Sequence, residues 1–172
     1  MCRNVVPIIV RHGFTMIELL IVVAILAIAA AIAVPMVSSA GSMQLRAAVT
    51  MMAADLEYAK SMSISRGQRY SVVFDKTTET YRITDESGTT ISHPIKKGFF
   101  YTVDLRADGR LDQVDIVDAN FDGTSAVSFN YLGSPFNGAG TDLNSGVITL
   151  QAGGATRTVN VEPVTGYLSI SN

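Results

Sequence analysis

The sequence predicts an α+β fold, in which a long, bent N-terminal helix packs on a mostly antiparallel β-sheet head. Three observations predict it. An apolar run extends from Phe14 to Val34, a helical period continues beyond it, and the period of the apolar residues changes to two from Arg69 onward.

The apolar run contains one charge, at Glu18, and as a helix it would be about 31 Å long, which matches the hydrocarbon core of a bilayer. The residues before it include Arg3 and Arg11 and no acid. By the positive-inside rule that end stays in the cytoplasm. The sequence therefore predicts one membrane-spanning helix, with the bulk of the chain outside the cytoplasm.

The helical period continues beyond the apolar run, so we expect one helix over about 14–66. Pro35 predicts a bend, because proline removes a hydrogen bond and clashes with the preceding turn. Gly41 adds a second weak point, and Gly67 is placed to end the helix. The stripe that should face the head consists of Leu45, Val49, Met52, Leu56 and Ala59.

After the helix, short segments with period two predict strands joined by tight turns, and hence a mostly antiparallel sheet. The expected strands are residues 70–74, 80–84, 99–103, 126–131, 147–150, 157–161 and 167–170. Turn signals lie at residues 86–88, 108–109, 137–138 and 153–154.

Residues 13–18, Gly-Phe-Thr-Met-Ile-Glu, precede the apolar run, and Pro35 follows it. This N-terminus resembles that of type IV pilins and type II secretion pseudopilins. The resemblance implies that a prepilin peptidase cleaves between Gly13 and Phe14 and that Phe14 is then N-methylated. It divides the chain into a leader (1–13), a transmembrane and assembly helix (14–40) and an extracytoplasmic head (41–172).

A second resemblance covers the head. Residues 54–67 with the strand that follows them, and the segments at 147–150, 157–161 and 165–168, resemble the H-type pseudopilin of type II secretion and the FimT-like minor pilins. This implies a type IV pilin-like fold and a structural subunit at the tip or the start of a secretion pseudopilus or pilus. The implied partners are other pilins or pseudopilins, the prepilin peptidase and an inner-membrane assembly platform. The implied location is the bacterial inner membrane, with the head in the periplasm.

Glu18 has a physical role in such an assembly. Between helices packed without water, a lone carboxylate costs several kcal/mol unless a positive group neutralises it. After cleavage, the α-amino group of Phe14, in the same chain or a neighbour, could do so. Glu18 would then set the axial register of the subunits.

Three alternatives remain. The apolar run could be a plain membrane anchor, or a signal peptide cut after Ala40 that releases a secreted β-rich domain. A FimT-like subunit could instead bind DNA in uptake, but no Lys or Arg follows Arg157, which argues against a nucleic-acid partner. The basic residues that such a role would use are Arg66, Arg69, Lys96 and Lys97.

No metal or cofactor is expected in the head. Asp118, Asn120 and Asp122 alternate before Gly123 as in the first half of a calcium loop, but Phe129 occupies the position of the final bidentate Glu. We therefore expect residues 104–122 to form an exposed acidic loop, with calcium only as a weak possibility.

Catalysis has no support in the sequence. The single Cys, at position 2, excludes an intrachain disulfide and a thiol-based zinc site. Once the leader is removed, one imidazole remains, His93, in an expected solvent-facing loop, and no nucleophile motif accompanies it. The sequence predicts a non-enzyme.

Overall fold

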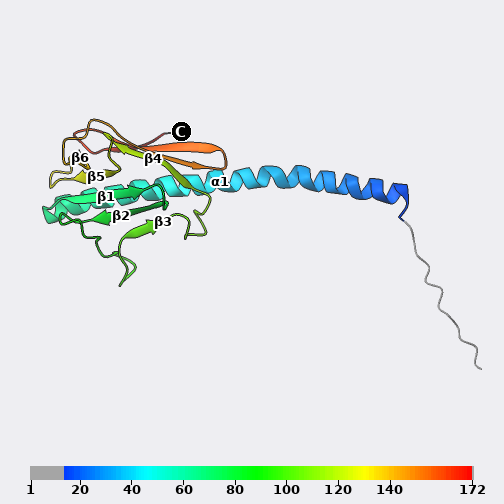
Figure 1. Cartoon of the computed structure of the whole chain (residues 1–172), viewed down its shortest axis with the longest axis horizontal. Coiled ribbons are helices and arrows are strands. Elements are labelled where there is room, and N and C mark those ends of the chain that lie inside the picture. The colour runs from blue at the N-terminus through cyan, green and yellow to red at the C-terminus, as the bar shows by residue number, and fades with distance from the viewer. Residues whose placement is uncertain (1–13, 172) are drawn as a thin grey trace, which may run out of the picture. The chain divides into compact units, whose positions relative to one another are not determined.

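The structure is a computed structural model that describes residues 14–171, except for the side chains of residues 32–39. Its elements are one helix, α1 (Met16–Arg66), and the strands β1 (Tyr70–Asp75), β2 (Thr80–Thr84), β3 (Thr102–Asp104), β4 (Asp115–Phe121), β5 (Ala126–Phe129), β6 (Pro135–Asn137), β7 (Gly146–Ala152), β8 (Ala155–Val161) and β9 (Leu168–Ser171) (Figure 1). The chain divides into two compact units within α1, after Met36. Among the described residues, no helix has the combination of length and hydropathy that a bilayer crossing requires.

The long helix and its buried stripe are confirmed. All five stripe residues are at most 1% exposed and belong to one core cluster with apolar side chains of both sheets. Gly67 follows the last helical residue with a φ of 66°, the left-handed conformation that ends helices at low cost for glycine. The bend at Pro35 stays a prediction, because its side chain lies outside the described part and its backbone is helical.

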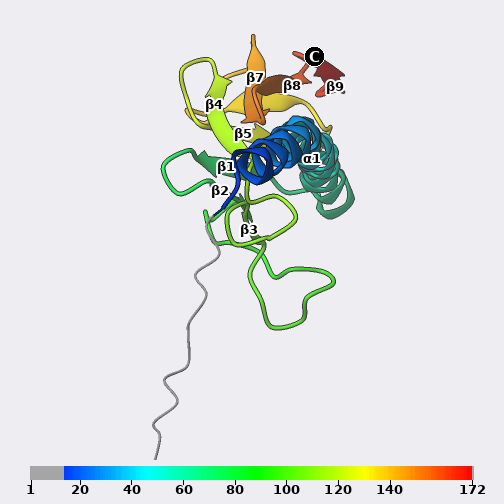
Figure 2. The same cartoon turned by 90° about the vertical axis from the view of Figure 1, so that its right-hand side faces the viewer.

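Two antiparallel sheets form the head where the sequence predicted one. The first has the strand order β3-β2-β1-β5-β6 and the second the order β4-β7-β8-β9. Figure 2, which looks along α1, shows strands of both sheets around one side of the helix. The expected turn at Gly153 and Gly154 joins β7 to β8, and both glycines have positive φ.

Two strand predictions are wrong. Residues 104–122 were expected to be an exposed acidic loop, but residues 115–121 form β4 and bury Ile116, Ala119 and Phe121, while Asp115, Val117 and Asn120 stay exposed. Conversely, the strand expected over 99–103 begins only at Thr102. The short strand β6 was not predicted at all.

Gly41, expected as a second weak point of the helix, lies in close contact with the turn between β7 and β8. A Cβ built on Gly41 would lie 2.9 Å from Cα of Gly153 and 3.3 Å from Oε1 of Gln113. Glycine at this position therefore lets the β7–β8 turn lie directly against the helix.

Candidate functional site

The first turns of α1 expose apolar side chains on every side. The large apolar residues between Phe14 and Ile28 are 46% to 82% exposed: Phe14, Met16, Ile17, Leu19, Leu20, Ile21, Val22, Val23, Ile25, Leu26 and Ile28. A helix that is apolar all round is typical of a segment that is covered by lipid or by other helices. This segment is the candidate membrane and assembly element.

Thr15 and Glu18 form a capping box at the start of this helix. The backbone N–H of Glu18 donates to Oγ1 of Thr15 at 3.3 Å, and the backbone N–H of Thr15 donates to Oε2 of Glu18 at 3.5 Å. Each side chain thus accepts a hydrogen bond from a backbone donor at the helix start, and the N–H of Glu18 also donates to the carbonyl of Thr15 at 3.1 Å. The Thr-x-x-Glu pattern is readable in the sequence, and our sequence analysis missed it.

The predicted processing residues are only partly described. Gly13 lies outside the described residues, whereas Phe14 is 77% exposed and lies before the first helical residue. The structure brings no positive side chain to Glu18 among the contacts of the described residues. The pairing of Glu18 with an α-amino group stays a prediction.

The three candidate calcium ligands already have partners. Asn120 Oδ1 accepts the N–H of Gly123 at 2.8 Å, and Asp118 pairs with Lys76 at 3.6 Å. The two carboxylate oxygens of Asp122 accept the backbone N–H groups of Asn144 and Ser145 at 2.8 and 3.0 Å. Within residues 14–171, apart from the side chains not described, no three His, Cys, Asp or Glu residues form a metal-binding group.

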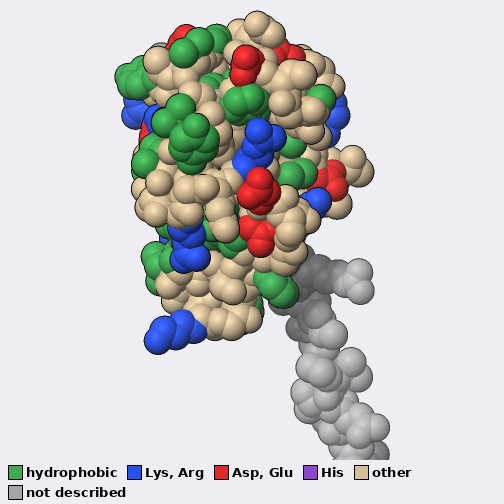
Figure 3. Space-filling model, turned by 90° about the vertical axis from the view of Figure 1, so that its left-hand side faces the viewer, with side chains coloured by type: hydrophobic (Ala, Val, Ile, Leu, Met, Phe, Trp, Pro, Cys, Tyr) green, Lys and Arg blue, Asp and Glu red, His purple; other side chains and the backbone are tan. Residues whose placement is uncertain are grey.

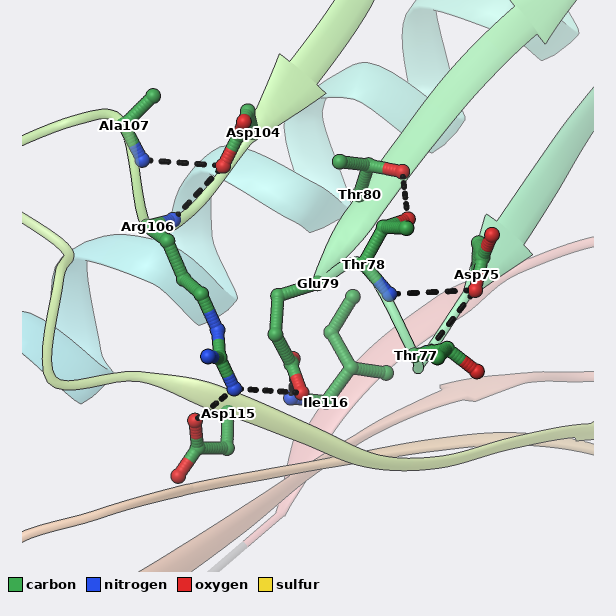
Figure 4. Close-up of polar contacts among 10 residues, drawn as sticks. All are labelled: Asp75, Thr77, Thr78, Glu79, Thr80, Asp104, Arg106, Ala107, Asp115 and Ile116. Atoms are coloured by element: carbon green, nitrogen blue, oxygen red, sulfur yellow. Dashed lines mark hydrogen bonds and ion pairs between the residues drawn. The ribbon is translucent and has the colours of Figure 1, made fainter.

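A buried carboxylate connects the two sheets. Glu79, in the β1–β2 turn, is 5% exposed, and its Oε2 accepts the backbone N–H of Ile116 on β4 at 2.5 Å. Its Oε1 lies 3.7 Å from Nη2 of Arg106, which lies equally far from Asp115 (Figure 4). The carboxylate of Glu79 therefore has both a hydrogen-bond donor and a positively charged partner. A buried carboxylate requires such partners, because burial without them is costly. No sequence signal distinguishes this glutamate from an ordinary turn residue.

A second acidic group fastens the helix to the first sheet. Asp55 accepts hydrogen bonds from the hydroxyl groups of Tyr81 at 2.6 Å and Tyr101 at 2.9 Å. Burial raises the pKa of Asp55, and the two hydroxyl donors oppose that shift. His93, expected to face solvent, is half-buried and stacks on the Tyr101 ring with centroids 4.6 Å apart. These hydrogen bonds and the ring stack hold α1 against the first sheet.

The four basic residues weighed for DNA binding lie in two different segments. Arg66 ends α1, and Arg69 follows it with its guanidinium 4.8 Å above the Phe136 ring. Lys96 and Lys97 are in the connection between β2 and β3. Arg69 is thus partly committed to packing within the head.

The comparisons with known proteins agree with this geometry. The family model of the prokaryotic N-terminal methylation motif matches residues 10–34, and that of the type II transport protein GspH matches residues 48–165. In sequence, no curated protein matches the chain.

Solved structures show the same fold. The minor pseudopilin EpsH from the type 2 secretion system of Vibrio cholerae is similar with a TM-score of 0.54 and 12% identity, over 74% of this chain and 96% of EpsH. The type IV minor pilin FimU of Pseudomonas aeruginosa is similar with a TM-score of 0.51 and 18% identity, over 76% of this chain and 90% of FimU. At these identities the likeness shows the type IV pilin-like fold alone. The GspH match, however, spans more than half of the sequence and follows the methylation motif, so the chain belongs to the GspH family of pilin-like type II transport proteins.

Proposed function

We propose that this chain is a minor pseudopilin or minor pilin that is cleaved between Gly13 and Phe14, methylated at Phe14 and assembled through α1. Before assembly it is stored as a single-pass protein of the bacterial inner membrane, with its head in the periplasm. It is a structural subunit, not an enzyme, and it enters a type II secretion pseudopilus or a type IV pilus at the tip or the start.

The contrast within α1 carries this proposal. From Phe14 to Ile28 the helix exposes apolar side chains all round, whereas from Leu45 onward it buries one stripe in the head. The apolar side chains of the first part are therefore not buried by the chain itself, whereas the head buries those of the second part. Lipid before assembly and neighbouring helices afterwards can both provide that cover, so transfer between them loses little apolar burial.

Glu18 restricts how the α1 helices of neighbouring subunits can pack against one another. In the chain described here its carboxylate contacts the N–H of Thr15, and the peptidase step would create an ammonium group at Phe14. A carboxylate between packed helices costs several kcal/mol without a positive partner. Only the axial offset that brings this ammonium to Glu18 avoids the cost.

The test compares Glu18→Val with Glu57→Val in the native host. Glu57 is an exposed acid on the head part of the same helix, 3.6 Å from Lys60, and serves as the matched control. We expect both variants to insert in the membrane. Only Glu18→Val should fail to appear in sheared filaments or in complexes with sibling subunits, with a drop of about tenfold or more.

Mass spectrometry of the chain from cells tests the processing step. The expected N-terminus is N-methylated Phe14. An uncut chain would overturn the proposal, and a chain trimmed after Ala40 would replace it with a secreted β-rich domain. Normal co-assembly of Glu18→Val would remove the role of the carboxylate.

A further inference from the structure

The connection between β2 and β3 exposes large apolar side chains next to two lysines. We define residues 93–100 as the 93–100 loop. Ile95 is 84% exposed, and Phe99 and Phe100 are each 68% exposed, with Lys96 and Lys97 between them in sequence. The connection is the lowest coloured part of the chain in Figures 1 and 2, and Figure 3 shows basic and hydrophobic side chains together at the lower end of the head.

Hydrogen bonds hold the loop in this conformation. The N–H of His93 donates to the carbonyl of Phe99 at 2.8 Å, and the N–H of Phe99 donates to the carbonyl of Lys96 at 3.2 Å. His93 Nδ1 accepts the N–H groups of Ile95 and Lys96, each at 3.1 Å. The His93 ring is fixed in turn by its stack on Tyr101.

An ordered loop that keeps its largest apolar side chains in water is typical of a binding surface. Because the backbone is already fixed, a partner would order few further groups on binding. Phenylalanine rings supply much of the contact energy of interfaces when a partner buries them.

We propose that the 93–100 loop docks on an acidic surface with an apolar centre, on the head of a neighbouring pilin-like subunit. The positive charges of Lys96 and Lys97 favour a partner surface that carries negative charge. Lys97 forms no ion pair within the described part of the chain, and Lys96 acts only at a distance on Asp108. Docked on an acidic rim, both lysines would gain partners while the phenylalanines are buried.

The loop lies beside the part of α1 that packs in the head. Ile95 and Lys96 line the same groove, of about 620 Å³, as Met51 and Asp55 of α1. At 1.5 Å per residue, these two helix residues lie about 21 and 27 Å along α1 from Val37, which itself follows the apolar run. A subunit whose helix packs along this part of α1 would bring its own head near the loop. This inference rests on the proposed assembly function.

The experiment uses the full chain in its native host, with p-benzoylphenylalanine at position 99 in place of Phe99. We expect ultraviolet light to yield a covalent adduct with another chain that carries the N-terminal methylation motif, with the cross-linked peptide rich in Asp or Glu. Lys96→Glu together with Lys97→Glu should reduce the adduct about tenfold. Lys76→Glu, which reverses an exposed charge elsewhere on the head, should leave its yield unchanged.

The other outcomes overturn the inference. An adduct with phospholipid would make the loop a membrane contact, and no adduct would leave it without a partner. If the adduct still forms at full yield in the variant with Lys96→Glu and Lys97→Glu, the partner surface is not recognised by its acidic charge. Mass spectrometry of the N-terminus in the same sample separates the two proposals: N-methylated Phe14 without an adduct overturns only the docking, whereas an uncut chain overturns the proposed function itself.

Discussion

The two ends of α1 belong to one helix but depend on different partners. Its N-terminal turns expose large apolar residues in every direction, whereas its C-terminal turns bury a stripe that runs from Leu45 to Ala59. The sequence shows the difference directly: the first part is continuously apolar, and the second repeats with steps of three and four. The period of apolar residues therefore indicates where the helix meets its own head and where its apolar side chains are left exposed.

The sharpest test of this comparison pairs two leucines of α1. Leu56 is 0% exposed in the head core, and Leu20 is 68% exposed. We expect Leu56→Ala to lower the unfolding free energy of the head by about 2 to 5 kcal/mol, because it leaves a cavity. Leu20→Ala should change it by less than about 0.5 kcal/mol. Denaturant unfolding of the full chain in detergent measures both, and equal effects would break the comparison.

Tyr81→Phe tests the polar attachment of the helix to the first sheet. Removing the hydroxyl leaves half-buried Asp55 with Tyr101 as its remaining hydroxyl donor, and we expect a loss of about 1 to 3 kcal/mol near neutral pH. Denaturant titrations measure it. The exposed Tyr131, changed to Phe, is the control and should have no effect.

The same tyrosines predict alkaline destabilisation. Burial, and then the charge of Asp55, raises the pKa of Tyr81 and Tyr101 above the ordinary value of 10.0. The unfolded chain loses these protons first, so their contribution is complete below about pH 10 and is lost as the pH rises through the higher folded values. The fall in stability above pH 10 should be shallower in Tyr81→Phe. An identical slope in both proteins would contradict this assignment.

Gly41→Ala tests the point at which the helix first meets the head. The new Cβ would lie 2.9 Å from Cα of Gly153, so the backbone must move. Strain of about 1 to 3 kcal/mol exceeds the helix propensity that alanine adds, and we expect a net loss of roughly 1 kcal/mol. Gly109→Ala meets nothing within 4 Å and should be neutral. Thermal melts of the two variants decide this, and a stabilised Gly41→Ala would show that the turn can yield.

The smallest expected effect concerns calcium. The oxygens of Asn120 and Asp122 already accept backbone N–H groups, so we expect the melting temperature of the head to be the same with EDTA and with added calcium. A clear upward shift with calcium would mean that these hydrogen bonds open to form a site.

Much of the fold could be predicted from local patterns. The helix, its stripe and the strands β1 and β2 follow from period and turn residues. The strand β4 was missed because its exposed face carries Asp115, Asp118 and Asn120, which read as a loop by composition, and a bulge after Ile116 interrupts the alternation. β6 spans only three residues, too few for a period to be detected.

The contacts of the candidate site also include a local one, which the sequence reveals, and long-range ones, which it does not. The capping box of Thr15 and Glu18 is local, and its spacing of three residues was available in the sequence. The partners of Glu79 and Asp55 were not, because Ile116 and Tyr81 reach them only through the packing of strands distant in sequence. Single-sequence patterns carry no information on such pairings.

Glu79 also determines where the second sheet can grow. By taking the N–H of Ile116, its carboxylate blocks the outer margin of β4 against another strand (Figure 4). The opposite margin is β9, whose residues Leu168–Ser171 include neither a charge nor a proline. Strand-to-strand association through the second sheet would therefore use the C-terminal strand, and Ile170→Lys is the substitution that should suppress it.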